Sequence, residues 1–177
     1  MEHLPFDPTF DDCEWTDGWT RVPVIQLVPG EYGAFSITSW RIEEADVCGR
    51  RIRLSQPLEV RGLETPDGRL WMSDVPQERL MMFNNAQASR GSVLVGGLGI
   101  GLYPQYAAAH VRELTVVEQN AALVDLVAPV VRVAADARGV PVTFHVGDVE
   151  ALLRREPSAR YDTIFLDTWD TLDAAHL

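Results

Sequence analysis

Length, composition and charge already restrict what this chain can do. Its 177 residues suffice for one domain with a hydrophobic core plus a small appendage. The 26 acidic and 15 basic residues give a formal net charge of -11, which argues against a general binder of nucleic acid or anionic membranes. Every basic residue is arginine, so the chain has no Walker A lysine and no lysine nucleophile or Schiff base.

The cysteines, the histidines and the N-terminus exclude further classes. Cys13 and Cys48 are too few for a disulfide framework, and we expect reduced thiols in a cytoplasmic protein without a signal peptide. Glycines and Pro104 interrupt the uncharged run 91–111, which predicts a strand, loop and helix instead of a membrane span. The four histidines lack the spacing of metal ligands, so no metal site is expected.

The chain begins with an acidic arm and a β region. Residues 1–20 carry six acids and no basic residue, which predicts a solvated arm; the alternative is a lid or partner-binding segment anchored by Trp15 and Trp19. Residues 21–73 predict a small antiparallel sheet in which Asp67-Gly68 forms a hairpin turn. Its expected strands are RVPVIQLV (21–28), GAFSITSWRI (33–42), RRIRLS (50–55), LEVRGL (58–63) and RLWMS (69–73).

A helix is predicted over residues 75–89. Asp74 is the expected N-cap residue, and Pro76 is tolerated in the first turn. Leu80 should face a neighbouring element together with Met81. The whole run Met81-Met82-Phe83 is expected in the core, because methionine fills irregular gaps.

From residue 92 onward, strand patterns alternate with helix patterns, which predicts a parallel sheet with right-handed crossovers. We therefore expect a Rossmann-like open α/β sheet over residues 74–177, truncated after its fourth strand and completed by a homo-oligomer or a partner chain. The expected strands are 92–96, 114–118, 142–146 and 161–167, and the expected helices are 102–111, 120–138 (capped by Asn120 and ended by Gly139) and 150–156.

Glycines and carboxylates follow these four strands, at the edge where an open parallel sheet binds its ligands. A glycine-rich turn lets the backbone approach a ligand closely, although a tight turn without a ligand is the alternative. The glycine spacing does not match G-x-G-x-x-G and no Lys-Ser/Thr pair follows, so NAD and ATP are less favoured. The residues in strand order are Gly97, Gly99 and Gly101, then Glu118, then Asp148, then Asp167 with Asp170.

Two of these acids have a candidate role and a simpler alternative. The spacing of Glu118 from the loop suits a carboxylate that accepts both hydroxyls of an adenosine ribose, whereas its alternative is to cap a helix or lie on the surface. Asp148 could accept a hydrogen bond from an adenine amine, or act as the N-cap of the next helix, and both roles can coexist.

The segments VLVGGLGIG, VVEQN, GDVEALL and YDTIFLDTWD together resemble the core of class I S-adenosylmethionine-dependent methyltransferases, and within them most closely the spermidine synthase-like branch. The resemblance covers about residues 70–171. It implies that the three loop glycines contact the methionine part of the cofactor. It also implies that Glu118 holds the ribose, that Asp148 holds the adenine, and that Asp167 and Asp170 face the acceptor.

Three functions remain open. The first is methyl transfer from S-adenosylmethionine to a small-molecule acceptor, in which Asp167 takes or orients the acceptor proton and Asp170 adds negative potential. The second is aminopropyl transfer from decarboxylated S-adenosylmethionine. The third is a non-catalytic domain that binds the cofactor or a partner. An acidic crevice favours a cationic acceptor and disfavours nucleic acid.

Overall fold

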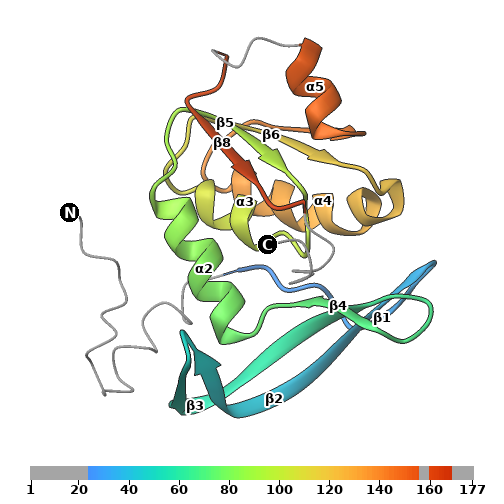
Figure 1. Ribbon diagram of the computed structural model, residues 1–177, viewed down its shortest axis with the longest axis vertical. Helices are drawn as coiled ribbons and strands as arrows, with labels where there is room; N and C mark the ends of the chain where they lie inside the picture. Colours follow the sequence, from blue (N-terminus) through green and yellow to red (C-terminus); the bar gives the residue numbers. More distant parts are fainter. Residues whose placement is uncertain (1–23, 156–159, 169–177) are drawn as a thin grey trace.

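The computed structural model describes residues 24–155 and 160–168, so the predicted acidic arm lies outside the described part. The chain is mixed α/β, with an antiparallel and a parallel sheet of four strands each. Figure 1 shows the two sheets one above the other, with α2 beside both. The elements are β1 (Gly30–Tyr32), β2 (Phe35–Val47), β3 (Arg50–Glu64), β4 (Leu70–Ser73), α2 (Pro76–Gln87), β5 (Ser92–Gly96), α3 (Leu102–Ala107), β6 (Glu113–Glu118), α4 (Ala121–Asp136), β7 (Val142–Val146), α5 (Val149–Arg155) and β8 (Thr163–Leu166).

The antiparallel sheet has the order β1-β2-β3-β4 and is built around the long β2–β3 hairpin. The hairpin turn is Cys48-Gly49, and both residues have the positive φ (51° and 77°) that tight hairpins require. The runs predicted as two strands, 50–55 and 58–63, form the single strand β3. A register shift near Ile42 lies opposite Pro57, which has no N–H to offer the ladder.

The predicted turn at Asp67-Gly68 is confirmed between β3 and β4. The Thr65 N–H donates to the Arg69 carbonyl (3.0 Å), and the Gly68 N–H donates to the Thr65 carbonyl (2.8 Å). Gly68 has a φ of 76°, which explains the need for glycine at this position. By contrast, residues 24–28 were expected to begin the sheet but form no strand.

The parallel sheet has the order β7-β6-β5-β8 and contains all four predicted strands. β5 lies inside it and every one of its residues is buried. Its side chains alternate between two layers: Val93 and Val95 belong to the main core with α3 and α4, whereas Leu94 packs with Val149 and Leu152 of α5. This explains why β5 is apolar throughout, as strands covered on both faces are.

The boundaries of α4 follow the predicted signals. The Asn120 side chain accepts hydrogen bonds from the N–H groups of Ala122 (3.0 Å) and Leu123 (3.3 Å), which confirms it as the N-cap. Gly139 follows the helix with a φ of 68°, a left-handed conformation that ends helices. The chain therefore turns sharply back towards β7.

Two predictions about α2 were wrong: the identity of its N-cap residue and the burial of Met81. Asp74 is not the N-cap: Val75 occupies that position without a side-chain hydrogen bond, while Asp74 is buried against Arg79. Leu80 is buried as expected, at 1% exposure, but Met81 is 44% exposed. Successive helix residues point about 100° apart, so the two side chains cannot share one contact face.

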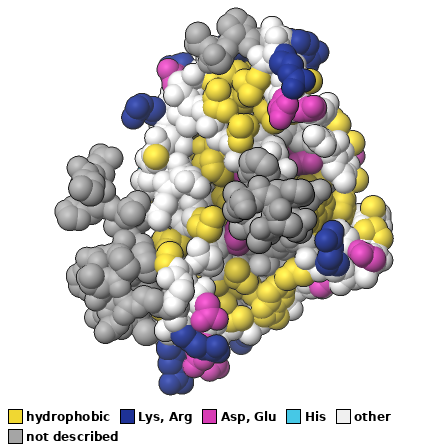
Figure 2. All heavy atoms as spheres, viewed as in Figure 1, with side chains coloured by type: hydrophobic (Ala, Val, Ile, Leu, Met, Phe, Trp, Pro, Cys, Tyr) yellow, Lys and Arg dark blue, Asp and Glu magenta, His cyan; other side chains and the backbone are white. Residues whose placement is uncertain are grey.

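One hydrophobic core joins the two sheets. It contains buried residues of the antiparallel region (Leu27, Phe35, Ile37 and Leu63) together with residues of the parallel region that include Val93, Val95, Tyr103, Tyr106 and Val127. The second face of the parallel sheet is covered less completely, since Ile164 and Leu166 of the edge strand β8 are 39% and 47% exposed. Figure 2 shows hydrophobic side chains gathered over β8 and α5. None of the helices in the described residues is long and apolar enough to cross a membrane.

Candidate functional site

A cavity of about 1160 Å³ lies where the strands of the parallel sheet end. The order of the sheet changes direction at β5 and β8, and open α/β sheets bind ligands at such a point. The opposite wall comes from β4 and α2. The lining residues that the following argument uses are Trp71 and Met72 of β4, Glu78, Met81 and Met82 of α2, Gly97 and Gly99 after β5, Tyr103 of α3, Glu118 at the end of β6, and Phe165 and Asp167 at the end of β8.

The three loop glycines have different structural tasks. Gly97 (φ 88°) and Gly99 (φ 54°) line the cavity. A Cβ on Gly97 would lie 2.1 Å from the Asp167 carbonyl oxygen, so the loop can pass the end of β8 because this residue has no side chain. Gly101 is buried outside the lining, where a Cβ would meet Val127 at 2.9 Å. Its role is the close packing of α3 on α4.

Glu118 connects the glycine loop to the start of α4. One carboxylate oxygen accepts the Leu98 N–H (2.9 Å) and the other accepts the Asn120 N–H (2.8 Å). The side chain is half-buried and lines the cavity. A carboxylate has about four acceptor positions, so about two remain for hydroxyl groups of a ligand. The structural role, which the sequence offered as an alternative, therefore leaves the ribose role open.

Asp148 lies beside the cavity but is absent from its lining residues, although Gly147 before it is present. One of its carboxylate oxygens accepts the Glu150 N–H (2.8 Å), and the Leu152 N–H donates to its carbonyl oxygen (3.1 Å) at the start of α5. This is the helix-capping role foreseen from the sequence. Contact with adenine stays a prediction.

Of the two predicted acceptor-side acids, Asp167 can be placed. It lines the cavity directly after β8, and desolvation by the surrounding protein raises the pKa of its carboxyl group. The strand end brings it beside Gly97, as the sequence predicted. Asp170 and Trp169 lie outside the described residues.

Glu78, on the first turn of α2, is a cavity residue that the sequence analysis missed. It is half-buried, and desolvation, followed by the charge of Asp167, raises the pKa of its carboxyl group. An acid on the helix that leads into the first parallel strand was the available signal. Only the packing of the two sheets shows that this helix borders the strand ends.

Aromatic and methionine side chains form the rest of the wall. Tyr103 stacks on Phe165 with ring centroids 3.7 Å apart and an angle of 11° between the planes. Trp71 stacks on Phe35 of β2 at 5.7 Å. Met81, predicted as core, is exposed and lines the cavity. Met82 and Phe83 pack against the hydrophobic core as predicted, and Met82 also lines the cavity. This wall offers apolar surface to a planar group or a thioether.

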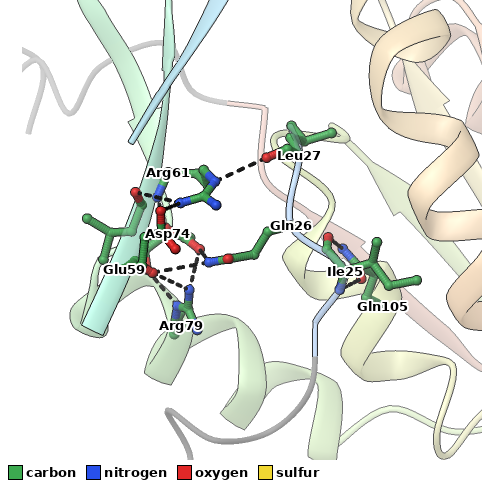
Figure 3. Close-up of polar contacts among 9 residues, drawn as sticks. Ile25, Gln26, Leu27, Glu59, Arg61, Asp74, Arg79 and Gln105 are labelled. Carbon is green, nitrogen blue, oxygen red and sulfur yellow. Dashed lines mark hydrogen bonds and ion pairs between the residues drawn. The ribbon is translucent and has the colours of Figure 1, made fainter. Parts of the chain in front are cut away.

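A buried polar network holds α2 against the antiparallel sheet (Figure 3). Asp74 is 2% exposed, accepts the Arg61 backbone N–H and forms an ion pair with Arg79, which is 3% exposed. The Gln26 side-chain amide donates to Asp74 (3.2 Å) and to the Glu59 carbonyl (3.1 Å). The network fixes the position of α2, and so the position of Glu78.

The segment before the antiparallel sheet is also held by α3. The Gln105 side-chain oxygen accepts the Ile25 N–H (2.7 Å), and its amide donates to the Ile25 carbonyl (3.3 Å), as Figure 3 shows. Gln105 is 2% exposed. The Leu27 carbonyl accepts a hydrogen bond from Arg61 (3.1 Å). Residues 25–27 therefore bind both α3 and β3, which explains why they pair with no strand.

The charges of the lining residues all have one sign. The cavity contains Glu78, Glu118 and Asp167, and no Arg or His of residues 24–155 or 160–168 lines it. Within the described ranges, no group of three or more His, Cys, Asp or Glu residues could hold a metal ion. The site therefore suits a cationic or neutral organic ligand.

Comparison with known proteins does not assign the chain to a family. No family model matches the chain, and no curated protein is significantly similar to it.

Proposed function

We propose that the chain carries a Rossmann-like domain that binds S-adenosylmethionine and transfers its methyl group to a small-molecule acceptor. The observation that carries the proposal is the joint position of the glycine loop and Glu118 at the switch point of the parallel sheet. Gly97 and Gly99 expose backbone to the cavity, and Glu118 keeps free acceptor positions beside them.

The cavity fits such a ligand in size and in charge. Ligand cavities commonly measure about 300–1,000 Å³, so 1160 Å³ accommodates an adenosine-containing cofactor with a small acceptor beside it. The sulfonium of S-adenosylmethionine is a cation, and the three lining carboxyl groups attract it. Gly97, Gly99 and Glu118 would hold the cofactor, with Asp148 near the adenine.

The residues of this chain would mainly bind and orient. S-adenosylmethionine supplies an already activated methyl group, so the protein needs chiefly to align the acceptor and exclude water. Asp167 is the residue we assign to the acceptor proton, since its raised pKa makes the carboxylate a better proton acceptor. Asp170 is proposed to add negative charge near it.

A second function is favoured by one observation. S-adenosylmethionine carries a carboxylate, and the lining residues that the structure describes include no Arg or His side chain to neutralise it. The decarboxylated cofactor lacks that group, so its affinity suffers no repulsion from Glu78 or Asp167. Aminopropyl transfer is therefore the alternative that we retain.

Calorimetric titration with S-adenosylmethionine, decarboxylated S-adenosylmethionine and NAD in parallel tests the proposal. We expect saturable binding of the first, weakened at least tenfold in Glu118→Ala because hydrogen bonds to a charged group contribute about 1.5–3 kcal/mol. The matched control is Glu43→Ala, which removes an exposed acid of β2.

Each outcome leads to a different conclusion. A preference for the decarboxylated form would replace methyl transfer by aminopropyl transfer. Binding of NAD alone would assign the loop to a dinucleotide. No binding of any of the three to a folded chain would contradict both transferase proposals and leave a non-catalytic domain.

A further inference from the structure

The methionines of this protein gather at the cavity. The chain has four, and the three that follow Met1 all line it: Met72 of β4, and Met81 and Met82 of α2. Met72 and Met82 are half-buried and pack against the hydrophobic core, whereas Met81 is 44% exposed. An accessible thioether sulfur is open to oxidation, so the cavity wall presents three candidate sites of modification.

Met72 is distinguished by the contact that its sulfur makes. A Cβ on Gly99 would lie 3.3 Å from the Met72 Sδ atom, so this sulfur lies against the glycine loop from the side of the antiparallel sheet. The Gly99 N–H has no hydrogen-bond acceptor among the described residues. It is therefore a donor that a ligand in the cavity can use, and the Met72 sulfur lies beside it.

We propose that Met72 is a modification site, and that oxidation of its thioether to a sulfoxide weakens the binding of a ligand at the glycine loop. Hydrogen peroxide supplies the oxygen. The sulfur lone pair attacks one peroxide oxygen, the O–O bond breaks, and the other oxygen leaves with both protons as water, so the peroxide gains the two electrons that sulfur loses. The effect on binding rests on the proposed function, whereas the oxidation itself does not.

The sulfoxide changes the cavity wall in two ways. An apolar group becomes a polar acceptor, in a cavity whose described lining has no Arg or His side chain to donate to it. The Gly99 N–H lies beside it, so the sulfoxide oxygen competes with the ligand for this donor. The added atom also takes up space against the loop, where a ligand needs close approach to glycine backbone.

Met81 provides the comparison within the same wall. It is more exposed than Met72, so we expect the peroxide to oxidise it first. Met81 belongs to α2, and its oxidation leaves the contact between Met72 and Gly99 in place. Leucine has nearly the volume of methionine but no sulfur, so Met72→Leu and Met81→Leu form a matched pair of variants.

The test titrates the full chain and both variants with sinefungin, before and after treatment with hydrogen peroxide. Sinefungin is an analogue of S-adenosylmethionine in which a carbon-borne amine replaces the sulfonium, so this probe has no sulfur to oxidise. Peptide mass spectrometry measures sulfoxide formation at each methionine, with and without saturating sinefungin. Methionine sulfoxide reductases with a dithiol, which release the oxygen as water and form a disulfide, test for reversal.

We expect the peroxide to weaken sinefungin binding about tenfold or more in the wild type and in Met81→Leu, and by less than about twofold in Met72→Leu. Bound sinefungin should slow the oxidation of Met72 more than that of Met81, because the half-buried Met72 is reached through the cavity. The reductases should restore binding.

Equal weakening in Met72→Leu and the wild type, or unchanged affinity of a wild-type chain whose Met72 is oxidised, would overturn the role of Met72 and leave the transferase proposal intact. Oxidation of Met81 without any oxidation of Met72 would overturn the modification site. Failure of the untreated chain to bind sinefungin would contradict the proposed function and the effect on binding, while the mass spectra still decide whether Met72 is oxidised.

Discussion

Asp74 and Glu78 stand four residues apart at the start of α2, yet their surroundings are opposite. Asp74 is 2% exposed and has Arg79, the Arg61 backbone and Gln26 as partners. Glu78 is half-buried beside Asp167, and no described residue provides it with a cation. The start of α2 thus has, just before the helix, an acid paired with a cation on the side of the antiparallel sheet, and, in its first turn, an acid without such a partner on the side of the cavity.

The difference separates a structural site from a candidate binding site. Arg79 and the Arg61 backbone N–H both bind Asp74. No described arginine lines the cavity, so its acids have no cation to balance them there. A buried acid with all its partners indicates fold stability, whereas a desolvated acid without one indicates a ligand.

The largest effect on stability is expected from a substitution that breaks the buried ion pair between Asp74 and Arg79. Asp74→Asn removes the charge that faces Arg79, which is 3% exposed, and should lower the free energy of unfolding by about 3–5 kcal/mol. Urea denaturation of this variant and of Glu150→Gln measures the difference. Glu150 forms an exposed ion pair with Arg154, so its loss should cost at most about 0.5 kcal/mol. Equal losses would show that the network does not stabilise α2.

An intermediate effect is expected at the glycine loop beside the cavity. Gly97→Ala combines a left-handed φ of 88° with a Cβ placed 2.1 Å from the Asp167 carbonyl oxygen. Gly139→Ala has a similar φ of 68° but nothing within 4 Å of the new Cβ, so it should cost about 1–2 kcal/mol from backbone strain alone. Gly97→Ala should cost clearly more in the same denaturation experiment. Equal costs would contradict the close approach of loop and β8.

The smallest effect is a gain in stability when the charge of Glu78 is removed. The raised pKa of Glu78 means that the folded chain holds this proton more tightly than the unfolded chain does. The protonated Glu78 side chain therefore contributes fully to the free energy of unfolding below its ordinary pKa of 4.5. This contribution is lost as the pH rises through the raised pKa of the folded chain. Glu78→Gln should melt slightly higher than the wild type at pH 7 and equally at pH 4.

Thermal melts at both pH values measure this gain, with Glu64→Gln as the comparison. Glu64 is half-buried as well but accepts the Thr38 hydroxyl, so its replacement should bring no gain. A loss of stability in Glu78→Gln at pH 7 would indicate a structural role for Glu78 and contradict the contrast with Asp74.

Much of the fold could be predicted because its signals are local. Periodicity located β5, β6, β7 and β8, Asn120 marked the start of α4, and Asp67-Gly68 marked a hairpin turn. Two predictions on α2 were wrong for tertiary reasons. Asp74 resembled an N-cap in sequence, but the buried guanidinium of Arg79 binds it instead. Met81 was assigned to the core, although it lines a cavity.

The part of the candidate site formed by the parallel sheet could be predicted from the sequence, whereas the part formed by α2 could not. Parallel strands bring their carboxyl ends together, so Gly97, Glu118 and Asp167 could be grouped from the chain order alone. Glu78 could not be added, because its place depends on how the antiparallel sheet and α2 pack over the strand ends. No local pattern encodes that contact. The cofactor, the acceptor and the association of subunits stay predictions.

The two hydrogen bonds between Gln105 and Ile25 determine where the chain can be divided into fragments. The two residues are 80 positions apart, and α3 begins directly after the glycine loop. A fragment that starts at β1 would leave the buried Gln105 amide without its partner. One that starts at α2 would also leave Arg79 without Asp74. An expression fragment intended to retain the cavity should therefore include Val24 and the residues after it, although they form no strand.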